Sequence, residues 1–475
     1  MKDSIPLQNE QLFYIENQFI LVGEPGAIDV ILDMADVNPQ KLQMVYEIAI
    51  SDLIGQETPM PGLEDKRNYV IRQYTYSDDT TPIIEYINNL AQADNLGVFA
   101  DFNYLIAANP WTAAGSPWTA AGSPWTAAGS PWTAAGSPWT AAGSPWTAAG
   151  SPWNKGAQGG TNTRQKALDI FYSQWAFGKN GMHAQVGPHA PQDAGQGVRV
   201  GVFDTSPFPI TFSSADFNLN PDLHLNLVHP IPGGVVSGCG PGTAADHGLF
   251  VAGLIHALAP YSEIHLIRVL DDAAQGVLSI LLAALAQFIS DVNADSSNLN
   301  GAVINLSLGL IGSADEDMVG PVSLRLLLDV AHALNIVIVA AAGNDSAPVA
   351  GSHGPQIPAS WDNVIGVAAS NYYQNLACFA NWGDIMAPGG SGYSAHCLPG
   401  LDKCRGKDCR YALISLSTSS WTGFSYGVGS SFAAPLVSGL VALMLAREDW
   451  KPCLEIKEKL SLNTDDGVVD ARVLL

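Results

Sequence analysis

The sequence predicts an α/β protein with a parallel sheet covered by helices on both faces, preceded by a small α+β domain. From about residue 164 onward, short apolar runs alternate with longer helix-like segments, the rhythm of βαβ units. These runs are continuously apolar, which indicates strands buried on both faces. Before residue 108 the segments instead follow the order βαββαβ, which is typical of a ferredoxin-like unit.

Length and composition set the broad class of this protein. The chain has 475 residues, 47% of them hydrophobic and 14% charged, which is typical of a globular protein with one large core. A net charge of -23 argues against nucleic acid or an anionic membrane surface as partner. No stretch is long enough for a transmembrane helix. Because no apolar signal core is visible near Met1, we expect a cytoplasmic protein, with secretion as the alternative.

Residues 1–108 form the first predicted domain, and their apolar spacing defines its elements. The expected strands are 18–22, 45–50, 69–76 and 98–106, and the expected helices are 27–34 and 82–93. No set of side chains suited to catalysis is visible in this domain.

Residues 109–163 form a predicted linker built on a seven-residue repeat. The unit Pro-Trp-Thr-Ala-Ala-Gly-Ser recurs with Trp at positions 111, 118, 125, 132, 139, 146 and 153. Pro and Gly in every unit exclude a continuous helix or coiled coil. We expect turn and polyproline II character, with an aromatic ladder for carbohydrate or a partner protein as the alternative.

Residues 164–475 form the predicted α/β domain. The expected strands are 198–203, 262–269, 302–307, 336–341 and 364–369, and the expected helices are 248–258, 276–292, 322–334 and 432–445. In such a sheet, functional groups lie at the carboxyl ends of the strands and in the loops that follow them.

Four polar side chains occupy positions of this kind. Asp204 ends a buried strand, and His247 opens a helix for which Asp246 is the expected cap. Ser431 opens the long apolar helix near the C-terminus. A nucleophilic serine needs a base, and the base needs a carboxylate that fixes its tautomer. Asn344 follows another buried strand, where its amide N–H could donate to an oxyanion.

The segments around these residues resemble the motifs of the subtilisin-like serine proteases, and the resemblance covers most of residues 164–475. The matching segments are Asp204-Thr205-Ser206, His247-Gly248-Leu249-Phe250-Val251-Ala252-Gly253, Ser307-Leu308-Gly309, Ala342-Gly343-Asn344 and Ser430-Ser431-Phe432-Ala433-Ala434-Pro435. Each motif is weak alone, but five in the family's order are specific. The resemblance implies a serine endopeptidase in which Ser431 attacks, His247 moves the proton and Asp204 orients His247.

A substrate cleft is also implied by the resemblance. An extended protein or peptide substrate would pair with Ser307, Leu308 and Gly309. The walls of the primary specificity pocket would be Ala341, Ala342 and Gly343. Because these residues are small and uncharged, we expect an apolar or aromatic residue before the cleaved bond. The chemistry requires no cofactor, and no metal ligands are assigned. Whether a structural calcium ion binds is left as an open question.

Four residues depart from the family's motifs. Ser206 stands where the family has Gly, Leu249 where it has Thr, Phe250 where it has His, and Phe432 where it has Met. None of these changes removes a group that handles a proton or a developing charge, so we expect activity with an altered rate or specificity. The alternative is a binding protein of the subtilisin fold without useful catalysis.

The resemblance gives the first domain a role as well. Residues 1–108 resemble an inhibitory propeptide that assists folding, so the protein's own N-terminal domain would be its intramolecular inhibitor. The last strand of this domain would approach the active cleft, and we expect self-cleavage between about residues 105 and 175. An unrelated accessory domain is the alternative.

Two other sequence patterns, which would indicate an α/β-hydrolase or a zinc site, are weaker evidence of function. The segment Gly423-Phe424-Ser425-Tyr426-Gly427 fits the nucleophile elbow of α/β-hydrolases, but that fold needs a His after the Ser, and the last His of the chain is His396. Four potential zinc ligands lie close together in the sequence, namely His396, Cys397, Cys404 and Cys409. Their spacing favours a local disulfide or free thiols over a zinc site.

Overall fold

The computed structural model describes most of the elements predicted for both domains. The described residues are 14–35, 37–54, 62–94, 97–108, 168–206, 225–228, 246–271, 274–296, 298–310, 320–344, 346, 354–390, 411–417, 424–447, 453–462, 464–465 and 467–474. The predicted linker and the cluster around His396 lie outside the described residues, so the interpretations of both stay predictions.

The N-terminal domain is an antiparallel sheet with two helices packed on one face. Its elements are β1 (Tyr14–Gly23), α1 (Pro25–Met34), β2 (Leu42–Ala49), α2 (Ile50–Ile54), β3 (Val70–Tyr76), α3 (Thr81–Asp94) and β4 (Phe99–Ala108). The strand order is β4-β1-β3-β2. Ile28 and Ile31 of α1 and Ile84 and Ile87 of α3 pack with the sheet into one hydrophobic core. The predicted element order is confirmed, and the short helix α2 is an addition to it.

The larger domain follows from β5 to the end of the chain. Its elements are β5 (Val198–Asp204), β6 (Leu225–Val228), α6 (His247–Leu258), β7 (Glu263–Arg268), β8 (Gln275–Val277), α7 (Leu278–Ala294), β9 (Gly301–Leu306), β10 (Leu308–Leu310), α8 (Val322–Ala333), β11 (Ile336–Ala341), β12 (Ile365–Ser370), β13 (Ile385–Pro388), β14 (Leu413–Leu416), β15 (Phe424–Gly427), α9 (Ser430–Leu445), α10 (Cys453–Leu462), β16 (Thr464–Asp465), β17 (Val468–Val469) and α11 (Ala471–Leu474).

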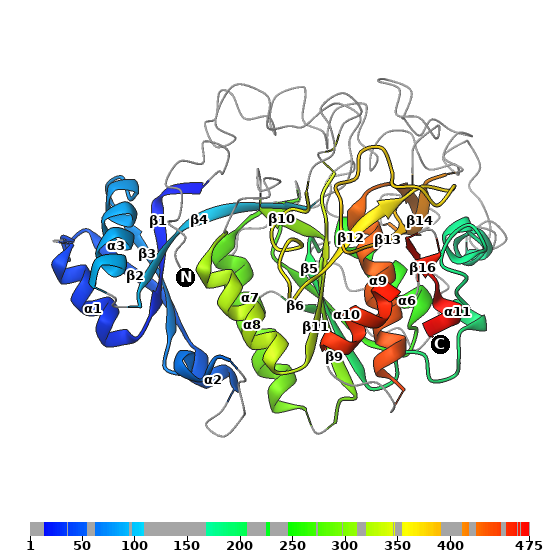
Figure 1. Ribbon diagram of the computed structural model, residues 1–475, viewed down its shortest axis with the longest axis horizontal. Helices are drawn as coiled ribbons and strands as arrows, with labels where there is room; N and C mark the ends of the chain where they lie inside the picture. The colour runs from blue at the N-terminus through cyan, green and yellow to red at the C-terminus, as the bar shows by residue number, and fades with distance from the viewer. Residues whose placement is uncertain are drawn as a thin grey trace.

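The main sheet of the larger domain is parallel, as predicted. Its described strands have the order β16-β17-β13-β12-β11-β9-β5-β7-β6, and every neighbouring pair from β17 to β6 is parallel. Helices α7 and α8 lie on one face, and α6 and α9 lie on the other (Figure 1). The register pairs Val202 with Asn305 and Leu306 with Ala340, so β5, β9 and β11 end at the same edge.

Strand β4 belongs to both domains and runs from the N-terminal sheet into the larger domain (Figure 1). Its first part pairs with β1, and its last residues lie between β10 and β8. Ala108 pairs with Leu308, and Ile106 is opposite both Leu310 and Gly276. The backbone N–H of Ala108 also donates to the carbonyl oxygen of Ala274 at 3.1 Å.

This arrangement explains one difference from the predicted elements. Residues 276–277 were expected to begin a helix, but they belong to strand β8, and α7 begins at Leu278. Strand β8 exists because β4 supplies its hydrogen-bond partners. Those partners lie about 170 residues away in the sequence, so local apolar spacing does not reveal them.

Two polar side chains of β4 accept hydrogen bonds from the N-termini of α8 and α7. Asp101 accepts hydrogen bonds from the backbone N–H groups of Val322 at 3.0 Å and Ser323 at 2.7 Å. Asn103 Oδ1 accepts from the N–H of Ser279 at 2.9 Å. Both side chains satisfy N–H groups that have no partner within their own helix. Burial raises the pKa of Asp101 above its ordinary value, although the hydrogen bonds from Ser323 and Val322 act in the opposite direction.

His256 is a buried titratable side chain in α6, with 1% of its surface exposed. Neither ring nitrogen has a hydrogen-bond partner within the part of the chain that the structure describes. Burial lowers the pKa of His256 to about 4 from its ordinary value of 6.5. The unfolded chain binds a proton near its ordinary pKa while the folded chain does not. The free energy of unfolding therefore falls as the pH drops from about 6.5 towards 4.

We expect His256→Leu to flatten the pH dependence of stability. Between about pH 7.5 and pH 5, the parent should lose about 2 kcal/mol more of its unfolding free energy than the variant, because one unit of pKa difference corresponds to about 1.4 kcal/mol. The measurement is urea unfolding at both pH values. A Ser431→Ala background in both proteins excludes self-digestion. Equal losses in the two proteins would show that this imidazole does not govern the acid sensitivity.

Candidate active site

A buried carboxylate–imidazole pair lies at the carboxyl edge of the parallel sheet. Asp204 is the last residue of β5, and His247 is the first residue of α6. The His247 Nδ1 atom lies 2.7 Å from Oδ1 and 2.9 Å from Oδ2 of Asp204, and both side chains are fully buried. In the neutral ring the carboxylate keeps the proton on Nδ1, which leaves Nε2 as the basic nitrogen.

A close contact between β5 and α6 sets this geometry. The Gly248 N–H donates to Thr205 Oγ1 at 2.9 Å, and the Thr205 N–H donates to Asp204 Oδ1 at 2.6 Å. A Cβ atom on Gly248 would lie 2.1 Å from the Thr205 carbonyl oxygen, so the contact requires glycine. The predicted capping by Asp246 is wrong. Its side chain makes no capping bond and instead accepts a hydrogen bond from Ser417 Oγ at 2.9 Å.

Ser431 lies in the first turn of α9 and is fully buried. Its hydroxyl donates to the carbonyl oxygen of Ser307 at 3.1 Å, and the Ser307 hydroxyl donates to the carbonyl oxygen of Ser431 at 2.8 Å. Helix α9 packs against α6, and the ring of Phe432 lies 5.3 Å from the ring of His247, between centroids. The structure therefore brings Ser431 to the sheet edge that carries Asp204 and His247.

Asn344 follows β11 and contacts the start of α9. Its Oδ1 atom accepts the backbone N–H of Ser430 at 2.9 Å. A backbone N–H can only donate, so this contact fixes the orientation of the amide and directs Nδ2 to the other side. The preceding Gly343 has a φ of 112°, and a Cβ atom there would lie 2.5 Å from Asn381 Nδ2. The segment therefore requires glycine just before the amide that would serve as the oxyanion donor.

Two of the departures from the family's motifs pack against each other. The rings of Phe250 and Phe432 lie 4.4 Å apart between centroids, and both are fully buried. Leu249 is also fully buried. The sequence gives no sign that these positions touch, because they lie in different motifs. In the structure the rings of Phe250 and Phe432 pack together, and that of Phe432 lies beside the His247 imidazole.

The residues predicted to bind substrate lie along this edge. Leu308 and Gly309 belong to β10, where they pair with Ala108 and Ala107 of β4. Ala341 ends β11 and is followed by Ala342, and both are fully buried. The role of Ala341, Ala342 and Gly343 as pocket walls stays a prediction.

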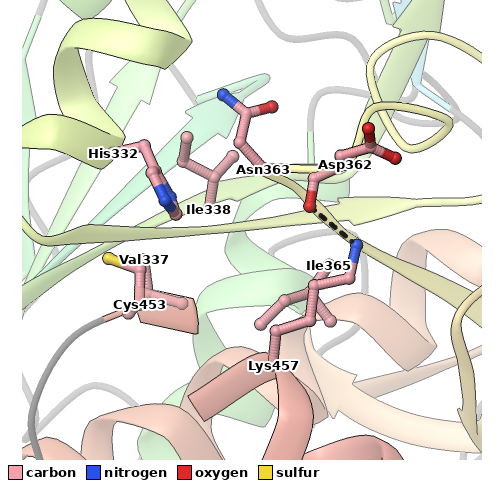
Figure 2. Close-up of a pocket in the computed structure, with 8 residues that line it drawn as sticks. All are labelled: His332, Val337, Ile338, Asp362, Asn363, Ile365, Cys453 and Lys457. Atoms are coloured by element: carbon pink, nitrogen blue, oxygen red, sulfur yellow. Dashed lines mark hydrogen bonds between the residues drawn. The ribbon is translucent and has the colours of Figure 1, made fainter. Parts of the chain in front are cut away.

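A small pocket lies at the opposite edge of the sheet (Figure 2). Its lining residues are His332, Val337, Ile338, Asp362, Asn363, Ile365, Cys453 and Lys457. Val337 and Ile365 stand near the starts of β11 and β12, so the pocket is at the amino-terminal edge. Its volume of about 10 Å³ has room for about one water molecule. The Lys457 Nζ atom donates to the carbonyl oxygen of Asp362 at 3.0 Å, which joins α10 to the turn before β12.

Three further observations concern metals, cysteines and membranes. Among the described residues, no group of three or more His, Cys, Asp or Glu side chains is placed to hold a metal ion. Cys378 is disulfide-bonded. Within the described ranges, none of the helices combines the length and the apolar character needed to cross a membrane.

Comparison with known proteins gives one family. The model of the subtilase family matches residues 195–473, a range that contains Asp204, His247, Asn344 and Ser431. Subtilisin DY of Bacillus licheniformis is 30% identical over 287 residues, which cover 56% of this chain and 83% of that protein. The thermophilic serine proteinase of Bacillus sp. (strain AK1) is 29% identical, covering 51% of this chain and 55% of its own length. An extracellular protease of Xanthomonas campestris pv. campestris is 28% identical, covering 57% and 48%.

We expect Asn344→Asp to lower kcat about 100- to 1000-fold with little change in KM. The new carboxylate retains the acceptor for the Ser430 N–H. It removes the N–H donor and adds negative charge where an oxyanion would form. The measurement is steady-state hydrolysis of a chromogenic peptide, with the unfolding temperature of the variant as a control for folding. A folded variant with the parent's kcat would exclude Asn344 from stabilising the oxyanion.

Proposed function

Because the chain belongs to the subtilase family, we propose that it is a serine endopeptidase that hydrolyses peptide bonds through an acyl-enzyme, made as a self-processed precursor. The observation that carries the proposal is the buried Asp204–His247 pair, with a contact of 2.7 Å, at the sheet edge that also carries Ser431 and Asn344. Chemistry of this kind requires no cofactor, and its substrates are proteins or peptides.

Each residue has a distinct role in the proposed reaction. Asp204 holds the His247 proton on Nδ1, so Nε2 takes the proton of Ser431 as its hydroxyl attacks the carbonyl carbon. The oxyanion receives hydrogen bonds from Asn344 Nδ2 and from the backbone N–H of Ser431 at the positive end of α9. His247 then gives the proton to the leaving amine, and water hydrolyses the acyl-enzyme by the reverse sequence.

The N-terminal domain is the proposed intramolecular inhibitor. Residues 1–108 would be the propeptide, 109–163 the linker and 164–475 the peptidase domain. Strand β4 supports this role, because Ala107 and Ala108 pair with Gly309 and Leu308, the segment proposed to bind substrate. An extended substrate and β4 would compete for the same backbone groups.

Secretion is the proposed location, in place of the cytoplasmic location expected from the sequence. The observation behind this change is that one relative carries the name extracellular protease. The peptidase domain would then act on proteins outside the cell.

The central test compares the parent chain with Ser431→Ala. We expect the parent to shorten over time, with a new N-terminus between about residues 105 and 175, and to cleave casein. The variant should stay intact and inert, because it lacks the nucleophile, and the neighbouring Ser430 hydroxyl accepts the Gly343 N–H at 3.2 Å. The measurements are mass analysis over time, N-terminal sequencing and a casein assay.

Labelling by a fluorophosphonate probe provides the control for this comparison. Such a probe reacts only with an activated serine, so it should label the parent and not the variant. A folded parent that stays unlabelled and inert after trace protease has removed residues 1–153 would contradict the proposal. That outcome would favour a binding protein of the same fold.

The inhibitor role predicts faster labelling of Asp101→Ala than of the parent. This change leaves the N–H groups of Val322 and Ser323 without their acceptor. Each such loss weakens docking by about 1–3 kcal/mol, and we expect at least a tenfold higher initial rate of fluorophosphonate labelling. Asp33→Ala, on the exposed face of α1, is the matched control and should label at the parent's rate. Equal rates in all three proteins would contradict inhibition by the docked domain.

A further inference from the structure

A chain of hydrogen bonds connects two turns of α9 to the end of β9. Ser438 Oγ donates to Asn305 Oδ1 at 2.9 Å, and Asn305 Nδ2 donates to Ser307 Oγ at 3.0 Å. Ser307 Oγ then donates to the carbonyl oxygen of Ser431 at 2.8 Å. All four residues are fully buried, so no water competes for these groups.

The amide of Asn305 fixes which group donates at each step of this series of hydrogen bonds. An amide oxygen can only accept and an amide N–H can only donate. Because Asn305 Nδ2 donates to Ser307 Oγ, the single hydroxyl proton of Ser307 is left for another acceptor. It goes to the carbonyl oxygen of Ser431.

That carbonyl needs a partner from outside its helix. In an α-helix the carbonyl of residue 431 accepts from the N–H of residue 435. Residue 435 is proline, inside α9, and proline has no N–H. A buried carbonyl without a partner would destabilise the first turns of the helix. The Ser307 hydroxyl supplies the hydrogen bond that Pro435 cannot.

We propose that Asn305 and Ser438 are positioning residues for the nucleophile. They hold the Ser307 hydroxyl in the rotamer that fixes the backbone of Ser431, and they do so without touching substrate. The seven-residue separation of Ser431 and Ser438 is two helical turns, so both face the same strand. This role rests on the proposed function, in which Ser431 attacks.

Asn305→Asp is the sharpest variant, because it changes the direction of the hydrogen bonds and almost none of the shape. In its ionised form the new carboxylate still accepts from Ser438, but it has no proton to give to Ser307. The Ser307 hydroxyl then donates to the carboxylate and leaves the Ser431 carbonyl. We expect kcat to fall about 10- to 100-fold with KM within about twofold, the pattern of a displaced nucleophile.

Adding Pro435→Ala to Asn305→Asp in the same protein should restore the lost kcat. Alanine restores an N–H at residue 435, which can donate to the Ser431 carbonyl within the helix. The double variant Asn305→Asp, Pro435→Ala should recover at least about tenfold of the lost kcat relative to Asn305→Asp alone. A purely structural role for Asn305 would give no such recovery, because Pro435→Ala adds nothing at β9.

The measurements are kcat and KM of the full-length chain, with active sites titrated by the fluorophosphonate probe. Ser438→Ala, expected to lower kcat about two- to fivefold, tests the same chain of bonds if Asn305→Asp does not fold. An active parent whose folded variants keep its kcat, or a double variant without recovery, would overturn the positioning role. An inert parent would overturn the proposed function instead.

Discussion

The parallel register of the central sheet is the constraint on which the candidate site depends. Strands β5, β9 and β11 pair side by side and end together, so Asp204, Ser307 and Ala341 reach one edge although they are far apart in the sequence. The helices that follow must begin at that edge or cross back to it, which brings the starts of α6 and α9 there. His247 and Ser431 occupy these starts, where the backbone N–H groups and the helix dipole favour a developing negative charge.

Most of this arrangement is visible in the sequence, because each functional residue lies inside its own short motif. The continuous apolar runs predict buried parallel strands, and the topology of such sheets then predicts where polar residues at strand ends converge. Asp204, His247, Asn344 and Ser431 could be selected from this topology together with the motifs around them. Strand β8 could not, since it depends on β4, and the capping of α6 by Thr205 in place of Asp246 depends on a contact between residues 43 positions apart.

The remaining features arise from pairs of residues that no local pattern connects. Phe250 and Phe432 look like two separate departures from the family's motifs, yet their rings pack against each other. Nothing in the sequence singles out Asn305 in β9 or Ser438 in α9 until Pro435 is considered. Pro435 removes a hydrogen bond inside α9, and the hydroxyl of Ser307, just after β9, donates the replacement. Sequence reasoning identifies the groups that carry out chemistry, whereas the groups that hold them in place appear only when the packing is known.

Strand β4 belongs to the same polypeptide as its partners β8 and β10, so its local concentration is set by the chain and not by the amount of protein in solution. Effective concentrations of tethered segments reach the millimolar range. In the proposed precursor, dilution would therefore not displace β4, and substrates at micromolar levels would meet a filled site in most molecules. Inhibition would end in a molecule whose linker is cut, and each enzyme freed in this way could then cut the linker of other molecules. A population of such molecules would activate with a lag followed by acceleration, as autocatalytic reactions do.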